Sequence, residues 1–338
     1  MSVEADETGP MITPTPESAH ATDPADFAPF SQRALNGKVA LVAGATRGAG
    51  RAIARDLARA GAFVHCTGRS THGRPSDYGR TETIEDTAAL ITDEGGQAEA
   101  HVCDHLDPAR ISQVIDQIDT DHGRLDILVN DIGGEAYVEW GTPFWETELD
   151  TEMRLFRAGL LTHLHTAHAS LPLLTRNPGG LHIEITDGTA EFNASHYREN
   201  VFLDLTKTAV SRLAFGLGHE LNPVGSTAVA ITPGWLRSEM MLDHFGTSED
   251  NWMRDSLDET RTEPPRDFAI SETPHLLGRS VVALAADPDR HSFNSTTQDT
   301  HGLAAHYGFN DLDGSRPDSW SFITALENDP AADPREFR

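Results

Sequence analysis

The chain has 338 residues and a formal net charge of -27, from 53 acidic and 26 basic side chains. A surface of this charge repels nucleic-acid phosphates and anionic lipid headgroups, which argues against binding to nucleic acid or to membranes. No apolar run approaches the ~18 residues of a membrane span and no secretory segment precedes Arg33, so we expect a cytoplasmic protein. The acidity fits either a high-salt host or a biased genome composition.

Prolines and carboxylates dominate residues 1–36, which contain few aliphatic side chains. Such a segment cannot repay the entropy lost on ordering, and we expect a disordered acidic tail there. We expect a single domain over residues 37–310 and a C-terminal extension over 311–338. The two cysteines, Cys66 and Cys103, lie in apolar, strand-like runs and are expected to be buried free thiols.

Short apolar runs alternate with amphipathic segments from Lys38 onward. The predicted strands cover residues 39–43, 62–67, 98–103, 125–129, 181–185 and 227–231. The predicted helices cover residues 50–60, 83–93, 108–122, 152–174 and 202–220. This order predicts a parallel sheet covered on both faces, because parallel strands need crossover connections. The expected fold is a Rossmann-type, doubly wound α/β domain.

Residues 240–275 break this alternation before an expected seventh strand and are rich in Asp, Glu, Thr and Pro. An excursion at this place in an open α/β sheet commonly covers the ligand crevice. We therefore expect a substrate loop here, and a plain surface insertion is the alternative.

A glycine-rich loop joins the first predicted strand to the first predicted helix. Glycines permit a sharp turn and a close approach to a pyrophosphate, and the helix N-terminus offers free N–H groups to the anion. The residues expected to form this nucleotide site are Gly44, Thr46, Arg47, Gly48, Ala49 and Gly50. Because the loop stands at the head of a strand–helix series, we interpret it as a dinucleotide site.

The end of the second predicted strand indicates which dinucleotide binds. A NAD site places a carboxylate about 20 residues beyond the glycines, but this strand ends in a Thr-Gly-Arg-Ser sequence whose arginine is Arg69. A guanidinium there can hold a 2′-phosphate with help from Arg47, so we expect NADP(H). Asp104, after the third predicted strand, is expected to accept from the adenine amino group, and a helix cap is the alternative.

Several segments together resemble the short-chain dehydrogenase/reductase (SDR) family. They are the glycine loop, residues 125–130, Lys207 in a predicted helix, and residues 233–240 with their Pro-Gly start. Residues 144–146 and 307–314 are similar to the SDR group typified by dehydrogenase/reductase SDR family member one. The resemblance implies that NADP(H) lies in the crevice at the carboxyl ends of the strands.

The resemblance also implies roles for particular residues. Those that it places beside the cofactor are Asn130, Gly133, Lys207, Pro233, Gly234 and Ser238. Family members commonly pair through two long helices, here the helices that contain His163 and Thr208. We therefore expect a homodimer or a homotetramer that acts on a small-molecule substrate.

The expected catalytic centre departs from the family pattern. SDR chemistry uses a tyrosine four residues before the lysine to pass a proton to the carbonyl oxygen, and a serine to hold that oxygen. Here Leu203 stands at the tyrosine position and Asp187 at the serine position. Three explanations remain open. In the first, Asp187, Tyr197 or Lys207 replaces the tyrosine as the acid; in the second, the reaction is not ordinary carbonyl reduction; in the third, the cofactor is bound without turnover.

The segment with His163, His165 and His168 resembles a metal-binding pattern but has no carboxylate or cysteine partner at suitable spacing, so we expect no metal site. The expected function is NADP(H)-dependent oxidation or reduction of a small-to-medium organic carbonyl or imine compound. The alternative is a nonredox enzyme of cyclase or eliminase type, or an NADP-binding protein that keeps the cofactor as a scaffold.

Overall fold

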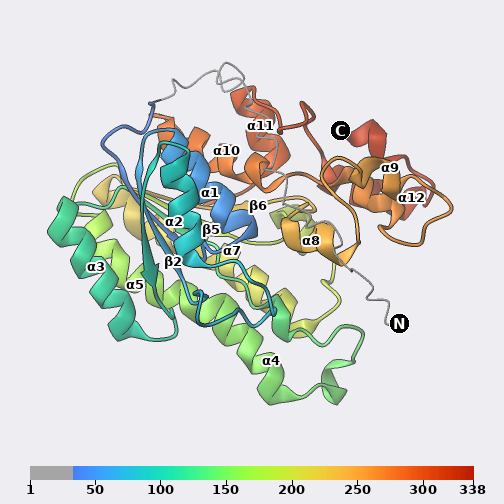
Figure 1. The fold of residues 1–338 in the computed structure, drawn as a ribbon, viewed down its shortest axis with the longest axis horizontal. Helices are drawn as coiled ribbons and strands as arrows, with labels where there is room; N and C mark the ends of the chain where they lie inside the picture. The colour runs from blue at the N-terminus through green and yellow to red at the C-terminus, as the bar shows by residue number, and fades with distance from the viewer. Residues whose placement is uncertain (1–32) are drawn as a thin grey trace, which may run out of the picture.

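A computed structural model describes residues 33–338, and its centre is one parallel sheet of seven strands (Figure 1). The strand order is β3-β2-β1-β4-β5-β6-β7. The strands are β1 (Val39–Ala43), β2 (Phe63–Gly68), β3 (Gln97–Val102), β4 (Ile127–Asn130), β5 (Leu181–Ile185), β6 (Thr227–Thr232) and β7 (Thr297–Asp299). Every neighbouring pair is parallel. The prediction of a Rossmann-type, doubly wound α/β sheet is confirmed.

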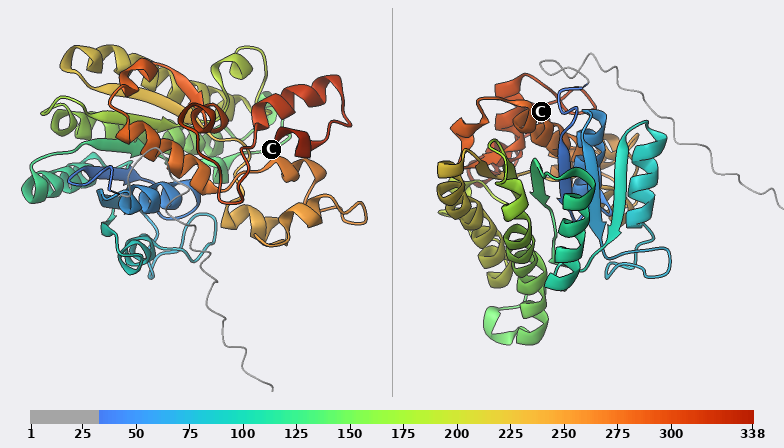
Figure 2. Two further views of the ribbon diagram at one scale, coloured as in Figure 1. Left: turned by 90° about the horizontal axis from the view of Figure 1, so that it is seen from above. Right: turned by 90° about the vertical axis from the view of Figure 1, so that its left-hand side faces the viewer.

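Helices cover both faces of this sheet (Figures 1 and 2). On one face lie α1 (Gly48–Arg59), α2 (Ile84–Asp93), α10 (Pro274–Ala286) and α11 (Thr300–Tyr307). On the other lie α3 (Pro108–His122), α5 (Thr162–Leu174) and α7 (Val201–Leu221). Val42 packs in the first core and Leu41 in the second, because successive strand residues point to opposite faces.

The long helix predicted over 152–174 is divided in the structure. It comprises α4 (Leu149–Phe156), a π turn (Arg157–Leu161) and α5. A Cβ atom on Gly159, within the π turn, would lie 2.7 Å from Cγ2 of Thr206. Glycine therefore permits α7 to approach this turn closely.

The carboxyl ends of the strands are covered by two segments that are distant in sequence. The expected excursion contains α8 (Glu239–His244), α9 (Trp252–Ser256) and a short turn at Arg266–Ile270, and Phe245, Trp252 and Phe268 form its own core. The C-terminal segment contains α12 (Ser319–Asn328) and lies beside this excursion (Figure 1). A short α6 (Ala190–Asn193) follows β5.

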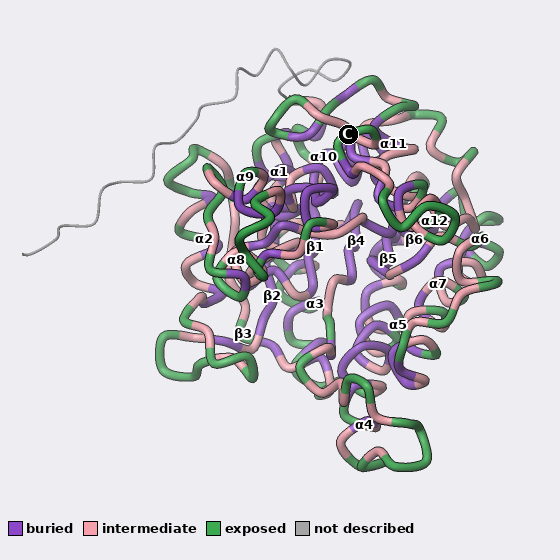
Figure 3. The backbone as a smooth tube through the Cα atoms, turned by 90° about the vertical axis from the view of Figure 1, so that its right-hand side faces the viewer, coloured by how far each residue is buried: buried purple, intermediate pink, exposed green. Residues whose placement is uncertain are grey.

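The strands of the sheet are largely buried, and exposed residues lie mainly in the outer helices and loops (Figure 3). Most of the expected tail lies outside the described residues, but Leu35 is 1% exposed and its N–H donates to Ala60 O at 2.9 Å. Leu35 therefore packs against the end of α1. Cys66 and Cys103 are buried free thiols, as predicted. Within residues 33–338, no helix is both long and apolar enough to cross a membrane.

Candidate functional site

A cavity of about 660 Å³ opens at the carboxyl ends of the strands. Its volume lies in the range of small-molecule sites. The predicted residues that line it are Gly44, Thr46, Arg47, Gly48, Ala49, Arg69, Asp104, Gly133, Asp187, Lys207, Pro233, Gly234 and Ser238. Gly50, Asn130 and Tyr197 are outside the lining. The structure thus brings most of the predicted cofactor residues and two of the three predicted catalytic residues to one site.

The glycine loop is closely packed against the segment after β4. Gly44 has φ +93°, and a Cβ atom there would lie 2.5 Å from Asp131 O. A Cβ atom on Gly50 would lie 2.3 Å from Gly44 O. Gly50 therefore permits the close packing between the loop and α1.

The N-terminus of α1 already receives an anionic group. Arg47, the N-cap residue, makes no side-chain cap, and the Gly48 N–H donates to Glu239 Oε1 at 2.9 Å. The carboxylate occupies the place where a helix N-terminus holds a phosphate. The loop therefore fits a dinucleotide diphosphate, provided that Glu239 moves aside or is displaced.

Arginines gather at the carboxyl end of β2. Arg69 donates from Nη2 to Asp77 Oδ2 at 2.7 Å, and Arg47 donates from Nη2 to Ser70 Oγ at 3.3 Å. Arg74, which the sequence reasoning missed, also lines the cavity. These guanidinium groups suit an additional phosphate at this end of the site.

Asp104 lines the same end of the cavity, and its Oδ1 accepts from the Leu106 N–H at 2.9 Å. The N-cap of α3 is instead Asp107, which accepts from the N–H groups of Ala109 and Arg110. Asp104 thus stabilises its own loop, and the cap of α3 does not depend on it.

Lys207 lies at the opposite end, surrounded by carboxylates. Its Nζ is 2.5 Å from Glu135 Oε1, and its carbonyl accepts from Thr186 Oγ1 at 2.8 Å, which ties α7 to the end of β5. Burial alone would lower the pKa of Lys207, but Glu135, Asp187 and Asp131 together raise it above its ordinary value. Lys207 is therefore kept in its charged ammonium form, because the neighbouring carboxylates outweigh the effect of burial on its pKa.

Asp131 follows β4, packs against the glycine loop and lines the cavity. Burial, reinforced by the charge of Glu135, raises the pKa of Asp131 to about 7 although Lys207 opposes this shift. Asp131 therefore changes charge in the neutral pH range, next to the expected cofactor.

The predicted proton donors differ in position. Asp187 lines the cavity, and its Oδ2 forms an ion pair with Nη2 of Arg198. Tyr197 is 60% exposed and does not line the cavity, so its predicted placement at the site is wrong. Leu203 is buried in an apolar cluster with Leu155 and Phe202, away from the lining.

Asn130 is expected beside the cofactor but does not line the cavity. It is fully buried under the cavity, and its Nδ2 donates to Glu184 Oε1 at 3.0 Å. Glu184 also accepts from His163 and His182, and these partners outweigh burial to hold its pKa at about 2. His163 Nε2 lies 2.9 Å from Ile132 O. This buried network supports the loop after β4 from below.

The lining residues that sequence reasoning missed include Glu135, Glu239, Trp320 and Ile323. Glu135 follows two glycines after β4, and a carboxylate just beyond a strand end is a signal that could have identified it. Trp320 and Ile323 belong to α12, whose position at the cavity depends on tertiary packing and has no local signature.

A family model described as short chain dehydrogenase matches residues 38–247. The chain belongs to the short-chain dehydrogenase/reductase family. Human "Dehydrogenase/reductase SDR family member 1" is 31% identical over 284 residues, which cover 83% of this chain and 85% of that protein. The "Cyclohexanol dehydrogenase" of Rhodococcus sp. is 28% identical over 249 residues, covering 70% and 87%.

Solved SDR structures share the fold. A short-chain dehydrogenase/reductase from Serratia marcescens superposes with a TM-score of 0.61 at 25% identity, covering 78% of this chain and 96% of that chain. A short chain dehydrogenase from Burkholderia cenocepacia in complex with NADP gives 0.59 at 23% identity, with the same coverage. SDR homologues are oxidoreductases that use NAD(P)(H), which agrees with a glycine loop and a lysine in one cavity.

Proposed function

We propose that this SDR chain is an NADP(H)-dependent oxidoreductase that transfers hydride between the nicotinamide and a small-to-medium organic carbonyl or imine compound. One observation supports this above the others. The Lys207 ammonium shares a single cavity with the glycine loop and with Pro233 and Gly234, where the family resemblance puts the nicotinamide. The cavity is large enough for the nicotinamide part of the cofactor and a small substrate.

NADP(H) is favoured over NAD(H) by the arginines at the end of β2. Arg69, Arg47 and Arg74 line this end of the cavity. The Arg69 guanidinium is engaged by Asp77, and a 2′-phosphate with its larger negative charge would compete for the same donors. We therefore assign the 2′-phosphate to Arg69 and Arg47, and the diphosphate to the Gly48 N–H and its neighbours in α1.

When bound, NADPH supplies hydride to the unsaturated carbon of the substrate. Lys207, kept charged by its carboxylate neighbours, stabilises the negative charge that develops on a carbonyl oxygen and donates a proton to it. Glu135 contacts the ammonium, and its side chain is 37% exposed, so it can return a proton from solvent to Lys207. Asp187 forms an ion pair with Arg198, and its negative charge helps to keep Lys207 protonated.

The residue types at this end favour imines within the proposed substrate class. Leu203 stands where the family resemblance expects the tyrosine. Among the described lining residues the one tyrosine is Tyr78, whose hydroxyl accepts from the Ala136 N–H at 3.2 Å, and burial raises the pKa of Tyr78 above its ordinary value, which makes it a weak proton donor. A protonated imine needs hydride but no proton donor. Glu135, Asp187 and Asp131 would also attract its positive charge.

A second candidate function follows from the leucine, Leu203, at the position where a tyrosine is expected. The chain would then bind NADP(H) and catalyse a cyclisation or elimination, or bind it without turnover. Oxidation of NADPH by matched pairs of ketones and cyclic imines distinguishes the candidates. The proposal expects turnover that is higher with imines, and reduction of ketones that is lost in Lys207→Met. NADPH binding without oxidation by any pair would favour the second candidate.

We also propose self-association through α5 and α7, as the resemblance implies. Each of these helices exposes a leucine, Leu164 at 41% and Leu205 at 54%. Sedimentation of the full chain should give a dimer or a tetramer, and Leu205→Glu should shift the chain toward a monomer.

A further inference from the structure

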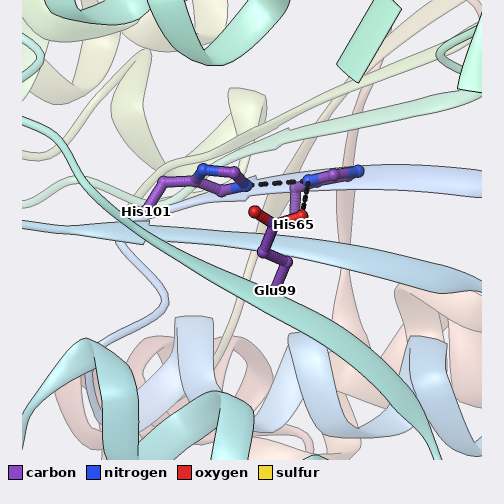
Figure 4. A group of neighbouring side chains, drawn as sticks. All are labelled: His65, Glu99 and His101. Atoms are coloured by element: carbon purple, nitrogen blue, oxygen red, sulfur yellow. Dashed lines mark hydrogen bonds and ion pairs between the residues drawn. The ribbon is translucent and has the colours of Figure 1, made fainter. Parts of the chain in front are cut away.

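The edge of the sheet farthest from β7 carries a group of metal-ligand side chains outside the cavity. His65 lies on β2, and Glu99 and His101 lie on β3, the edge strand (Figure 4). His65 stands directly opposite Glu99 in the strand register. Glu99 and His101 are two residues apart, so they point to the same face of the sheet. The fold thus places two imidazoles and one carboxylate together.

The ligand atoms of these three residues converge. His65 Nδ1 lies 2.8 Å from His101 Nε2 and 3.9 Å from Glu99 Oε2, and the three ligand atoms all lie within 4.8 Å of one another. In a tetrahedral zinc site, bonds of ~2.1 Å give ligand-to-ligand distances of about 3.4 Å. The observed distances bracket this value. Small rotations of Glu99, whose side chain is 44% exposed, and of His101 would close the set around one ion.

We propose that His65, Glu99 and His101 form a binding site for one divalent transition-metal ion of the Zn²⁺ type. Imidazole nitrogen and carboxylate oxygen are ligands that zinc accepts, and three protein ligands leave one position for water. This site contradicts the expectation of no metal, which considered only the histidines of α5.

The protonation state of the imidazoles suits this role. Burial, together with the charges of His101 and His122, lowers the pKa of His65 to about 3. Burial also lowers the pKa of His101, although Glu99 and Asp121 oppose the shift. Both rings are therefore neutral at pH 7, which is the form that binds metal.

The surroundings of the His65 ring leave its Nδ1 atom able to bind a metal ion. In the described part of the chain, His65 Nε2 is buried without a hydrogen-bond partner, so no second bond fixes the other tautomer. The ring stacks on His101 and meets the edge of His122, both with centroids 5.1 Å away. Asp121, next to His122, adds negative charge on the same side. An ion can enter over the exposed Glu99 carboxylate.

None of the three residues lines the cavity, so this site is separate from the proposed hydride-transfer site. A metal here would join β2 to β3 directly. It would therefore stabilise the edge strand, and its loss should leave the oxidation of NADPH unchanged.

Titration of the chelator-treated full chain with ZnCl₂, followed by calorimetry, tests the proposal. We expect one ion per chain and a rise in melting temperature, because an ion that binds the folded state stabilises it by mass action. His101→Gln and Glu99→Gln should each weaken binding at least 10-fold and remove the rise. His168→Gln removes an exposed imidazole of α5 and serves as the control, with unchanged binding.

Co²⁺ in place of Zn²⁺ supplies a spectroscopic readout, since its visible absorption is intense only in tetrahedral coordination. The wild type and His168→Gln should show this absorption, and Glu99→Gln should lose it. The proposal is overturned if ZnCl₂ binds with no defined stoichiometry, if Glu99→Gln and His101→Gln bind as the wild type does, or if His168→Gln loses as much affinity. In those cases His65 and His101 form only a hydrogen-bonded pair.

Discussion

The two ends of the cavity are built in different ways. At the nucleotide end, backbone geometry decides the structure: Gly44 turns with a positive φ, and the N–H of Gly48 points at an anionic group. At the Lys207 end, side-chain charge decides it, through ion pairs of Lys207 with Glu135 and of Asp187 with Arg198. Substitutions at the glycine loop should therefore disturb the backbone, whereas side chains at the Lys207 end can change while the fold is retained.

Replacing Lys207 should have the largest effect. Lys207→Met removes both the charge and the proton that act on the substrate, and we expect turnover to fall by about 100-fold or more. The melting temperature with saturating NADPH shows whether the cofactor still binds. The chain has one other lysine, Lys38, which pairs with Asp126 at 3.3 Å outside the cavity. Lys38→Met should leave turnover unchanged, and an equal loss in both variants would contradict the role of Lys207.

Removing Arg69 should have the next largest effect, confined to the nucleotide end. Arg69→Ala takes away charge-assisted hydrogen bonds of about 1.5–3 kcal/mol, which is roughly a 10- to 100-fold weaker affinity for NADPH. The affinity for NADH should change little, because NADH has no 2′-phosphate. Fluorescence titration with both nucleotides measures this. Arg55→Ala, at a half-buried arginine that pairs with Glu94 and does not line the cavity, is the control. A wild type without preference for NADPH would disprove the assignment.

Neutralising Glu239 should raise the affinity for NADPH, by a smaller factor than the loss expected for Arg69→Ala. Glu239 accepts from the Gly48 N–H, so its negative charge opposes a diphosphate at the same donor. Glu239→Gln should tighten NADPH binding by about three- to 10-fold, since a single partly exposed charge contributes on the order of 1 kcal/mol. Glu259→Gln, an exposed residue of the same excursion, should have no effect. Weaker binding in Glu239→Gln would mean that this carboxylate helps to hold the cofactor.

A pH experiment tests the buried carboxyl group of Glu272, which packs behind Gly234. Glu272 is fully buried and accepts from the Gly234 N–H at 3.1 Å, and burial with the charge of Asp311 raises its pKa to about 8. Between pH ~4.5 and ~8 the folded chain keeps this proton and the unfolded chain loses it. The free energy of unfolding should therefore fall as pH rises through this window, by at most ~1.4 kcal/mol per pH unit.

Glu272→Gln isolates this contribution, because glutamine does not titrate. Urea unfolding of both chains at several pH values should show the variant gaining stability relative to the wild type as pH rises from 5 to 8. A difference between the two chains that does not change with pH would contradict the raised pKa of Glu272.

The same contrast explains what could be predicted from the sequence. The strand over 181–185 and the helix over 108–122 were predicted at their observed bounds, because apolar runs, Pro108 and Gly123 mark them locally. The glycine loop was predicted because its geometry depends on a few adjacent residues. The positions of the Tyr197 and Asn130 side chains relative to the cavity have no such local pattern, because they depend on packing against distant segments. Trp320 reaches the cavity only through the folded C-terminal segment.

The central proposal is that this cavity transfers hydride although the sequence reasoning expects Leu203 at the position of the family's tyrosine. The most direct measurement mixes excess wild-type chain with NADPH carrying deuterium at the transferable C4 position and a panel of paired cyclic imines and ketones. Mass spectrometry of the products then locates the label. The account predicts one deuterium on the former imine or carbonyl carbon, with imines ahead of ketones, and no deuterium in the ketone products of Lys207→Met. Tight NADPH binding with no deuterium in any product would contradict it.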